Sequence, residues 1–156
     1  MASSKSLFAY RLIAEKWASN AFTGEGARLY GGRWNSPGLP VVYLGSTRSL
    51  CALELLVHLT TPSSRAKRFS MFQMEIPEDC IDSLEDPLPG TWQQEPPDHS
   101  TMQLGHKWLK NSSSLLLRVP SAIVPEEWNY LLNPLHQDYG KLSIPLAAPF
   151  RFDERL

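Results

Sequence analysis

The sequence predicts an α+β protein built from short elements joined by long loops. Its 156 residues are the length of one ordinary domain. Segments typical of strands and helices are mixed along the chain but do not alternate as regular βαβ units, so a doubly wound sheet is not expected. Thirteen prolines against nine glycines favour frequent breaks in regular structure. We therefore expect a single domain over residues 1–156, with no internal linker.

The composition excludes several classes of protein. Fifteen Lys and Arg against sixteen Asp and Glu leave a net charge of −1, which argues against non-specific nucleic-acid binding. No apolar run approaches the roughly 20 residues of a membrane span, and the first residues show no secretory signal. Two isolated cysteines and four scattered histidines predict neither a disulfide framework nor a metal site. A soluble, cytoplasmic protein is expected.

The first sixty residues predict two strands and one helix around a glycine-rich loop. Aromatic and branched residues predict strands at 6–13 and, after the loop, at 40–44. Residues 14–20 suit a short helical turn, and residues 23–39 an ordered loop. A helix is expected to begin at a cap formed by Ser46 or Thr47 and to run to about Leu59.

The rest of the chain predicts a mixture of strands, one helix and exposed loops. A strand is expected at 67–76, ended by Pro77, and an exposed proline-rich loop follows at 87–99. Asp98 or Ser100 can start a helix that ends near Lys110. The remaining elements are expected as a strand at 114–119 that resumes at 121–124, a helical turn or irregular segment at 125–132, and final short strands at 142–144 and 149–152.

Glu54 is the first candidate for a functional residue. It is the only formally charged residue in the segment Ser49–Leu59 (SLCALELLVHL). Burying a carboxylate costs several kcal/mol unless it is paired or hydrogen-bonded. Glu54 is therefore either a surface residue on a thin polar stripe or a carboxylate directed into a cleft, where it could bind sugar hydroxyls or stabilise positive charge. On a helix, the apolar face beside it would comprise Leu50, Leu53, Leu56 and Val57.

The glycine-rich segment Gly24–Gly38 is the second candidate. Arg28 and Arg33 supply positive charge, and Tyr30 and Trp34 supply flat surfaces. The planar fork of an arginine suits phosphate oxygens. The segment contains neither GxGxxG before a helix nor GxxxxGK[ST]. It is therefore either a phosphate-binding loop or a surface hairpin loop.

Arg11 and Ser121 are isolated polar residues in apolar surroundings. Arg11 lies in FAYRLIA, where it is either at an edge with its head in water or turned inward, paired with a ligand anion or with Glu54. Ser121 lies in RVPSAIV, where a serine usually bonds to the backbone. No GxSxG motif surrounds it, so a hydrolase nucleophile is not expected.

Four segments, in order along nearly the whole chain, carry a resemblance to a known family. They are YRL at Tyr10–Leu12, a long block at Gly26–Leu59, VPSAIVPEEWNYLLNPLHQDY at Val119–Tyr139, and PFRFDERL at Pro149–Leu156. The second block is the most specific, whereas residues 61–111 carry no comparable motif. The chain resembles the RES domain, the toxin of bacterial Xre–RES toxin–antitoxin pairs, which is named for an arginine, a glutamate and a serine.

The resemblance implies a fold akin to ADP-ribosyltransferase toxins, with a split β-sheet core and flanking helices around an NAD-binding cleft. It implies that NAD is the substrate and is cleaved by hydrolysis or phosphorolysis, without a metal. It also implies an Xre-type antitoxin that covers the cleft, DNA contact only through that partner, and dimers in a larger complex. The family's functional positions fall on Arg11, Arg33, Tyr43, Glu54 and Ser121, with Tyr30 and Asn133 as further cleft neighbours.

The expected chemistry assigns a role to each position. Breaking the nicotinamide–ribose bond builds positive charge on the sugar and releases a neutral group, so a carboxylate near the ribose matters more than a strong acid. Glu54 is expected to hold the ribose and stabilise this charge, while Arg11 and Arg33 bind the pyrophosphate. Tyr43 is expected to stack on nicotinamide or close the cleft wall. Ser121 would either bond the ribose or orient Glu54.

Two alternative functions remain open. A mono-ADP-ribosyltransferase would use the same cleft with a protein side chain, rather than water or phosphate, as the acceptor. A non-enzymatic binding module would use the segment Gly24–Gly38 and its aromatic residues as a partner surface, without NAD turnover. A nuclease toxin is not expected, because the chain is neutral and lacks a metal or paired-histidine pattern.

Overall fold

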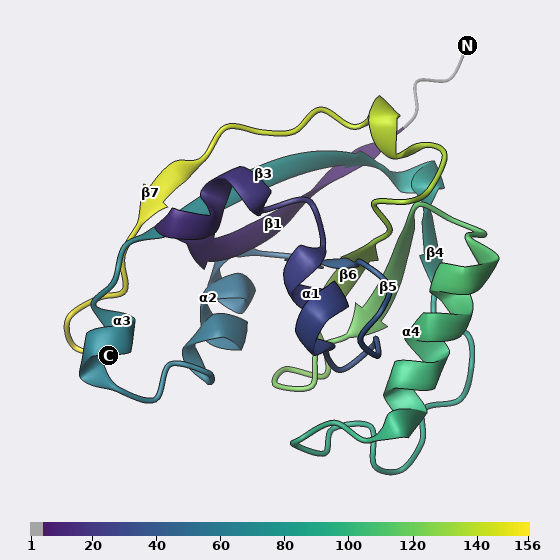
Figure 1. Ribbon diagram of the computed structural model, residues 1–156, viewed down its shortest axis with the longest axis horizontal. Coiled ribbons are helices and arrows are strands. Elements are labelled where there is room, and N and C mark those ends of the chain that lie inside the picture. The colour runs from purple at the N-terminus through teal and green to yellow at the C-terminus, as the bar shows by residue number, and fades with distance from the viewer. Residues whose placement is uncertain (1–4) are drawn as a thin grey trace.

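The computed structural model describes residues 5–156 as a seven-stranded mixed sheet with few helices (Figure 1), which confirms the α+β class. The strand order is β4-β5-β6-β2-β1-β3-β7, and only β4 and β5 pair in parallel. The strands are β1 (Ser6–Ala14), β2 (Val42–Gly45), β3 (Phe69–Pro77), β4 (Ile81–Ser83), β5 (Leu116–Pro120), β6 (Trp128–Leu132) and β7 (Ala148–Phe150).

Two capped helices support the sheet. Thr47 caps α2 by accepting a hydrogen bond from the Leu50 amide, and Asp98 caps α4 by accepting one from the Ser100 amide. Both caps are among those the sequence predicts. The helices are α1 (Glu25–Tyr30), α2 (Arg48–Leu56), α3 (Pro62–Arg65) and α4 (His99–Asn111), with 3-10 turns η1 (Glu15–Asn20), η2 (Glu78–Cys80) and η3 (Tyr139–Lys141).

The sheet is nearly split in two between β1 and β2. β1 pairs with β3 along its whole length, from Ser6 opposite Pro77 to Ala14 opposite Phe69. β2 pairs with β6 in the same way over its four residues. β1 and β2, however, are joined only at Tyr10 and Gly45 in the described register. We call this junction the β1–β2 seam.

The two main helices cover the same face of the sheet, one on each half. Cys51 of α2 packs with Leu12, Phe69 and Met71 of β1 and β3. Trp108 and Leu109 of α4 pack instead with residues of β5 and β6, namely Leu117, Val119 and Leu131. The alternate residues of these strands form a separate cluster on the opposite face, as the period of a strand requires. The seam therefore separates the half of the sheet that α2 covers from the half that α4 covers.

Several local predictions differ from the structure. Residues 128–132 form the strand β6 rather than a helical turn, because WNYLL is paired on both sides by β2 and β5. Residues 121–124 do not resume β5, since the Ser121 hydroxyl accepts from two following amides and bends the chain. The glycine-rich loop contains the short helix α1, and residues 142–144 are not a strand. The elements α3 and β4 were not predicted.

Candidate active site

A large cleft of about 1380 Å³ lies over the seam. Its walls come from β1, η1, α1 and the following turn, β2, α2, and the proline-rich segment 93–97. Among the residues expected from the sequence, the lining includes Arg11, Tyr30, Arg33, Tyr43 and Glu54. The cleft thus brings together candidates that span more than forty positions of the chain.

The seam is held together by side chains where backbone pairing is lacking. The guanidinium of Arg11 donates to the carbonyl oxygens of Ala21 and Tyr43, the latter at 3.0 Å. The Sγ atom of Cys51 donates to the Tyr10 carbonyl at 3.0 Å. Burial raises the pKa of the Cys51 thiol to about 11, so the thiol stays protonated and can donate. Buried backbone carbonyls at the seam are therefore satisfied from α2 and from Arg11.

Arg11 is a cation at the base of the cleft without an acidic partner. None of the ion pairs among residues 5–156 involves Arg11, so the expected alternative of pairing with Glu54 is not observed. Burial lowers the pKa of Arg11 to about 10, which leaves it protonated at neutral pH. Because Arg11 is among the residues that line the cleft, its positive charge could attract an anionic ligand there.

Glu54 is fixed by two neutral donors that approach the same oxygen. The Ser121 hydroxyl donates to Oε1 at 2.6 Å, and the Asn129 side-chain amide donates to Oε1 at 2.8 Å. Among residues 5–156, Oε2 accepts no hydrogen bond. Glu54 is partly buried and lies in the cleft lining. Its free oxygen is therefore the one available to a ligand.

Ser121 lies behind Glu54 and is fully buried. Its hydroxyl oxygen accepts from the Ile123 amide at 3.1 Å and from the Val124 amide at 3.0 Å, while its proton goes to Glu54. These three contacts use the whole hydrogen-bonding capacity of a hydroxyl. Of the two roles expected for Ser121, the contacts match the one in which it orients Glu54.

The apolar face predicted for the Glu54 helix is only partly correct. Leu50 is buried, but Leu53 is 37% exposed and Val57 is 52% exposed. The helix instead packs through Cys51, Ala52 and Leu55, because β1 and β3 lie on that side. Glu54 consequently lies at the edge between the buried face and the cleft.

Arg33 is partly buried and joins the glycine-rich turn to the proline-rich segment. Its guanidinium donates to the carbonyls of Trp92 at 2.9 Å and Gln94 at 2.8 Å. It also forms an ion pair with Glu95 at 2.9 Å, whose side chain is exposed. Arg33 thus lies in the cleft as expected, with its charge met by a carboxylate that a ligand anion could displace.

Tyr43 forms part of the cleft wall. Its hydroxyl donates to Asn35 Oδ1 and accepts from the Trp34 amide at 3.2 Å. Burial raises the pKa of Tyr43, so the hydroxyl remains a donor. A Cβ atom at Gly32 would lie 2.6 Å from the Tyr43 hydroxyl, so glycine is required for the turn to close on β2. These contacts fix Tyr43 in the wall of the cleft.

The two further cleft neighbours differ in position. Tyr30 is 84% exposed and lies in the cleft lining, together with the exposed side chains of Trp17, Leu29 and Val57. Asn133 is buried outside this lining, where its side chain donates to the Ser112 hydroxyl and accepts from the Leu135 amide. Asn133 therefore stabilises the chain just after β6, and the prediction that it borders the cleft is wrong.

Asn129 is the site residue that the sequence analysis missed. It opens onto the cleft from β6, 75 positions away from Glu54. The only available signal was its place inside the block Val119–Tyr139. Nothing in that block indicates that its amide meets the Glu54 carboxylate, since β6 itself was not predicted.

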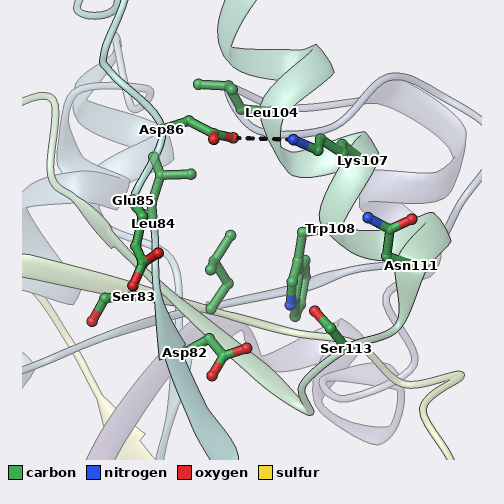
Figure 2. A pocket seen from close by; sticks show the side chains of 11 residues that line it. Asp82, Ser83, Leu84, Glu85, Asp86, Leu104, Lys107, Trp108, Asn111 and Ser113 are labelled. Carbon is green, nitrogen blue, oxygen red and sulfur yellow. Dashed lines mark ion pairs between the residues drawn. The ribbon is translucent and has the colours of Figure 1, made fainter.

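A second pocket of about 290 Å³ lies between α4 and the segment that follows β4 (Figure 2). The Asp86 carboxylate and the Lys107 ammonium face each other across it at 3.8 Å, and both side chains are exposed. None of the site residues expected from the sequence lines this pocket. The candidate chemistry is therefore concentrated in the larger cleft.

Within residues 5–156, no helix has both the length and the apolar character needed to span a membrane. In the same range, no group of three or more His, Cys, Asp or Glu residues is placed to hold a metal ion.

Comparisons with known proteins agree with this architecture. The chain is 42% identical over 149 residues to "Toxin Res" of Photorhabdus laumondii, covering 94% of this chain and 95% of the relative. It is 34% identical over 147 residues to the "Prs ADP-ribosylating toxin" of a Sphingobium species, covering 92% and 91%. Its fold matches a chain in the crystal structure of the M. tuberculosis MbcT-MbcA toxin-antitoxin complex, with a TM-score of 0.76 at 19% identity, covering 95% and 86%. The RES domain model matches residues 8–153, and the chain belongs to the RES domain family.

Proposed function

We propose that this chain is the toxin of a toxin–antitoxin pair and that it cleaves NAD at the nicotinamide–ribose bond, with water or phosphate as the acceptor. Membership of the RES domain family and two close relatives with toxin names support the first part. The second part depends on the chemistry of the cleft.

The hydrogen bonding of the Glu54 carboxylate is the observation that supports the proposal. Both donors bind Oε1, so the carboxylate is held at one oxygen while the other is free in the cleft. Both donors are also neutral, so they orient Glu54 without cancelling its negative charge. A fixed negative charge is what stabilises a sugar ring that becomes positive during bond cleavage.

The reaction can be written with these residues. The bond between the ribose C1′ and the nicotinamide nitrogen breaks, and its electron pair leaves with the neutral nicotinamide. Glu54 stabilises the resulting oxocarbenium-like ribose, with Oε2 near the ribose hydroxyls. Water or phosphate then forms a bond to C1′, and where water attacks, one proton is released to solvent. No step needs an oxidant or a strong general acid.

The rest of the cleft suits the other parts of a dinucleotide. Its volume exceeds the roughly 300–1,000 Å³ typical of small-molecule pockets, which leaves room for an extended ligand. The unpaired charge of Arg11 suits a pyrophosphate, and Arg33 can join it once Glu95 is displaced. Tyr43, whose carbonyl accepts from Arg11, forms part of the cleft wall.

A second candidate function is ADP-ribosyl transfer to a protein. It is favoured by the relative whose name describes an ADP-ribosylating toxin. The chemistry at C1′ would be the same, with a protein side chain as the acceptor. The exposed apolar side chains at the mouth of the cleft, Trp17, Leu29 and Tyr30, would then meet the acceptor protein.

The same apolar mouth supports a partner that covers the cleft. We propose an Xre-type antitoxin in this position, with the toxin as a dimer in the complex. A neighbour of the same fold occurs in a toxin-antitoxin complex. Copurification of the chain with its antitoxin, followed by loss of NAD cleavage in the complex, would be the expected result.

The central experiment compares the purified chain with its Glu54→Gln variant. Each is mixed with NAD, with and without phosphate, and nicotinamide release is followed by chromatography. Gln keeps an oxygen that can accept from Ser121 but removes the charge, so we expect kcat to fall roughly 100- to 1,000-fold with folding retained. Glu25→Gln is the matched control, because Glu25 lines the same cleft but is exposed and pairs with Arg28.

The products separate the candidate functions. ADP-ribose or its phosphate ester in solution would support NAD cleavage, whereas biotinylated NAD that labels a lysate protein would support transfer. Wild-type turnover in the Glu54→Gln variant would refute the role of the carboxylate. Absence of both products from the folded, antitoxin-free chain would favour the binding module.

A further inference from the structure

We propose that Asn129 is a positioning residue for Glu54, and that Asn129 and Ser121 together form a clamp that binds one carboxylate oxygen and leaves the other for the substrate. The kinetic form of this proposal rests on the NAD-cleaving function proposed above. Neither residue is expected to touch the reacting atoms; both act through Glu54.

The position of Asn129 is set by the middle of the sheet. In the register of β6 it lies opposite Gly45 of β2 on one side and opposite Val119 of β5 on the other. Ser121 follows directly after β5. Three neighbouring strands therefore fix the two donors relative to each other, and α2 carries the acceptor to them.

Gly45 makes the contact between α2 and β6 sterically possible. A Cβ atom at Gly45 would lie 2.8 Å from Cys51 Sγ and 3.6 Å from Asn129 Oδ1. The absence of a side chain there allows α2 to approach the sheet closely enough for Glu54, one turn after Cys51, to reach Asn129. The 3.6 Å distance places the side-chain oxygen Oδ1 of Asn129 on the Gly45 side, and its side-chain NH₂ group donates to Glu54.

The chemistry of the donor explains why an amide suits this position. A hydrogen bond to an ionised carboxylate is about twice as strong as a neutral one. A lysine or arginine at this point would also donate, but its charge would offset the negative charge that the sugar cation needs. An aspartate would place a second carboxylate against Glu54. An uncharged donor with two N–H groups orients Glu54 and preserves its charge.

The test uses two substitutions at Asn129 and one control. Asn129→Ala removes the donor, and we expect kcat for nicotinamide release to fall roughly 10- to 100-fold. The KM for NAD should stay within about twofold, because Asn129 does not contact the substrate. Asn111→Ala is the matched control, because Asn111 is an exposed asparagine that lines the second pocket and lies outside the cleft.

The pH dependence of the Asn129→Asp variant distinguishes a positioning role from a merely structural one. Two carboxylates at hydrogen-bond distance share a proton as pH falls, and the protonated form can donate to Glu54. We therefore expect the activity of this variant, relative to the wild type, to rise as the pH is lowered from 8 to 5. The relative activity of Asn129→Ala should be unchanged over the same range.

An NMR measurement tests the clamp without reference to the substrate. The side-chain ¹⁵N–¹H₂ signals of Asn129 should shift in Glu54→Ala, which removes the acceptor, while those of Asn111 stay in place. If the wild type is inactive on NAD but these signals shift, the proposed reaction fails and the clamp stands. Unshifted Asn129 signals, wild-type kcat in Asn129→Ala, or a KM effect alone would each overturn the proposal.

Discussion

Gly45 offers a direct test of the link between packing and activity. A Cβ atom at this position would lie 2.8 Å from Cys51 Sγ, whereas ordinary contacts begin near 3.4 Å. In Gly45→Ala, Cys51 must therefore give way by about 0.6 Å, the difference between these distances. Because its Sγ atom is held by the Tyr10 carbonyl, we expect α2 to move away from the sheet with it. Overpacking of this kind costs about 1–3 kcal/mol of unfolding free energy.

The same displacement should reduce activity more than stability suggests. Glu54 lies one turn along α2 from Cys51, and its bonds to Ser121 and Asn129 are already 2.6 and 2.8 Å long. A misplacement approaching 1 Å can lower a rate by about 100-fold. We expect urea unfolding to show the loss of stability, and nicotinamide release to fall at least tenfold in the protein that remains folded.

A double variant separates the steric effect from other causes. Cys51→Ala removes the Sγ atom that the new methyl group meets, although it also loses the bond to the Tyr10 carbonyl. The double variant Gly45→Ala, Cys51→Ala should be more stable than the sum of the single effects, by about 0.5–3 kcal/mol. Additive effects, or a Gly45→Ala protein with wild-type stability and activity, would refute the reasoning.

Two further predictions concern the walls of the cleft. Glu95→Gln frees Arg33 from its ion pair, so the KM for NAD should fall roughly two- to fivefold with kcat little changed; an increase in KM in steady-state kinetics would mean that Arg33 works only where Glu95 holds it. Gly105→Ala should cost about 3 kcal/mol in urea unfolding, because its Cβ atom would lie 1.7 Å from the Trp34 carbonyl oxygen. Gly140→Ala is the control, since nothing lies within 4 Å of its Cβ position, and equal stability of the two variants would contradict the packing described for α4.

The sequence predicted elements whose signals are local. The strand β1 and the helices α2 and α4 follow from runs of suitable residues and from caps at Thr47 and Asp98. The strand β6 could not be predicted in this way. Its five residues have no alternating pattern and follow Pro125, and they form a strand because β2 and β5 pair with both of their edges.

The candidate site, too, could be predicted only where its signal is local in the sequence. Glu54, Arg11 and Ser121 stood out as polar residues in apolar segments, and Arg33 as a charge in the glycine-rich segment. The resemblance added Tyr43 and gave all of them a role. The helical period did not show which side of α2 faces the sheet, so Leu53 and Val57 were placed on the wrong face. Asn129 could not be identified as a site residue, because its role depends on a hydrogen bond to Glu54 that forms only in the folded sheet.

The seam explains why the fold and the cleft cannot be varied independently. α2 and α4 pack on different halves of one sheet face. The cleft, lined by α1 and α2, lies over the junction where β1 and β2 are joined only at Tyr10 and Gly45. Carbonyls at this junction accept from Arg11 and Cys51, since a buried carbonyl without a donor would be costly. Arg11 therefore both stabilises the seam and provides the unpaired positive charge of the cleft. Its substitution would change the stability of the fold and the affinity for an anionic ligand together. The bond from Asn129 to Glu54 also crosses the seam, because α2 packs on β1 and β3 whereas Asn129 lies on β6. The unfolding free energy of each Glu54 or Asn129 variant must therefore be measured beside its activity.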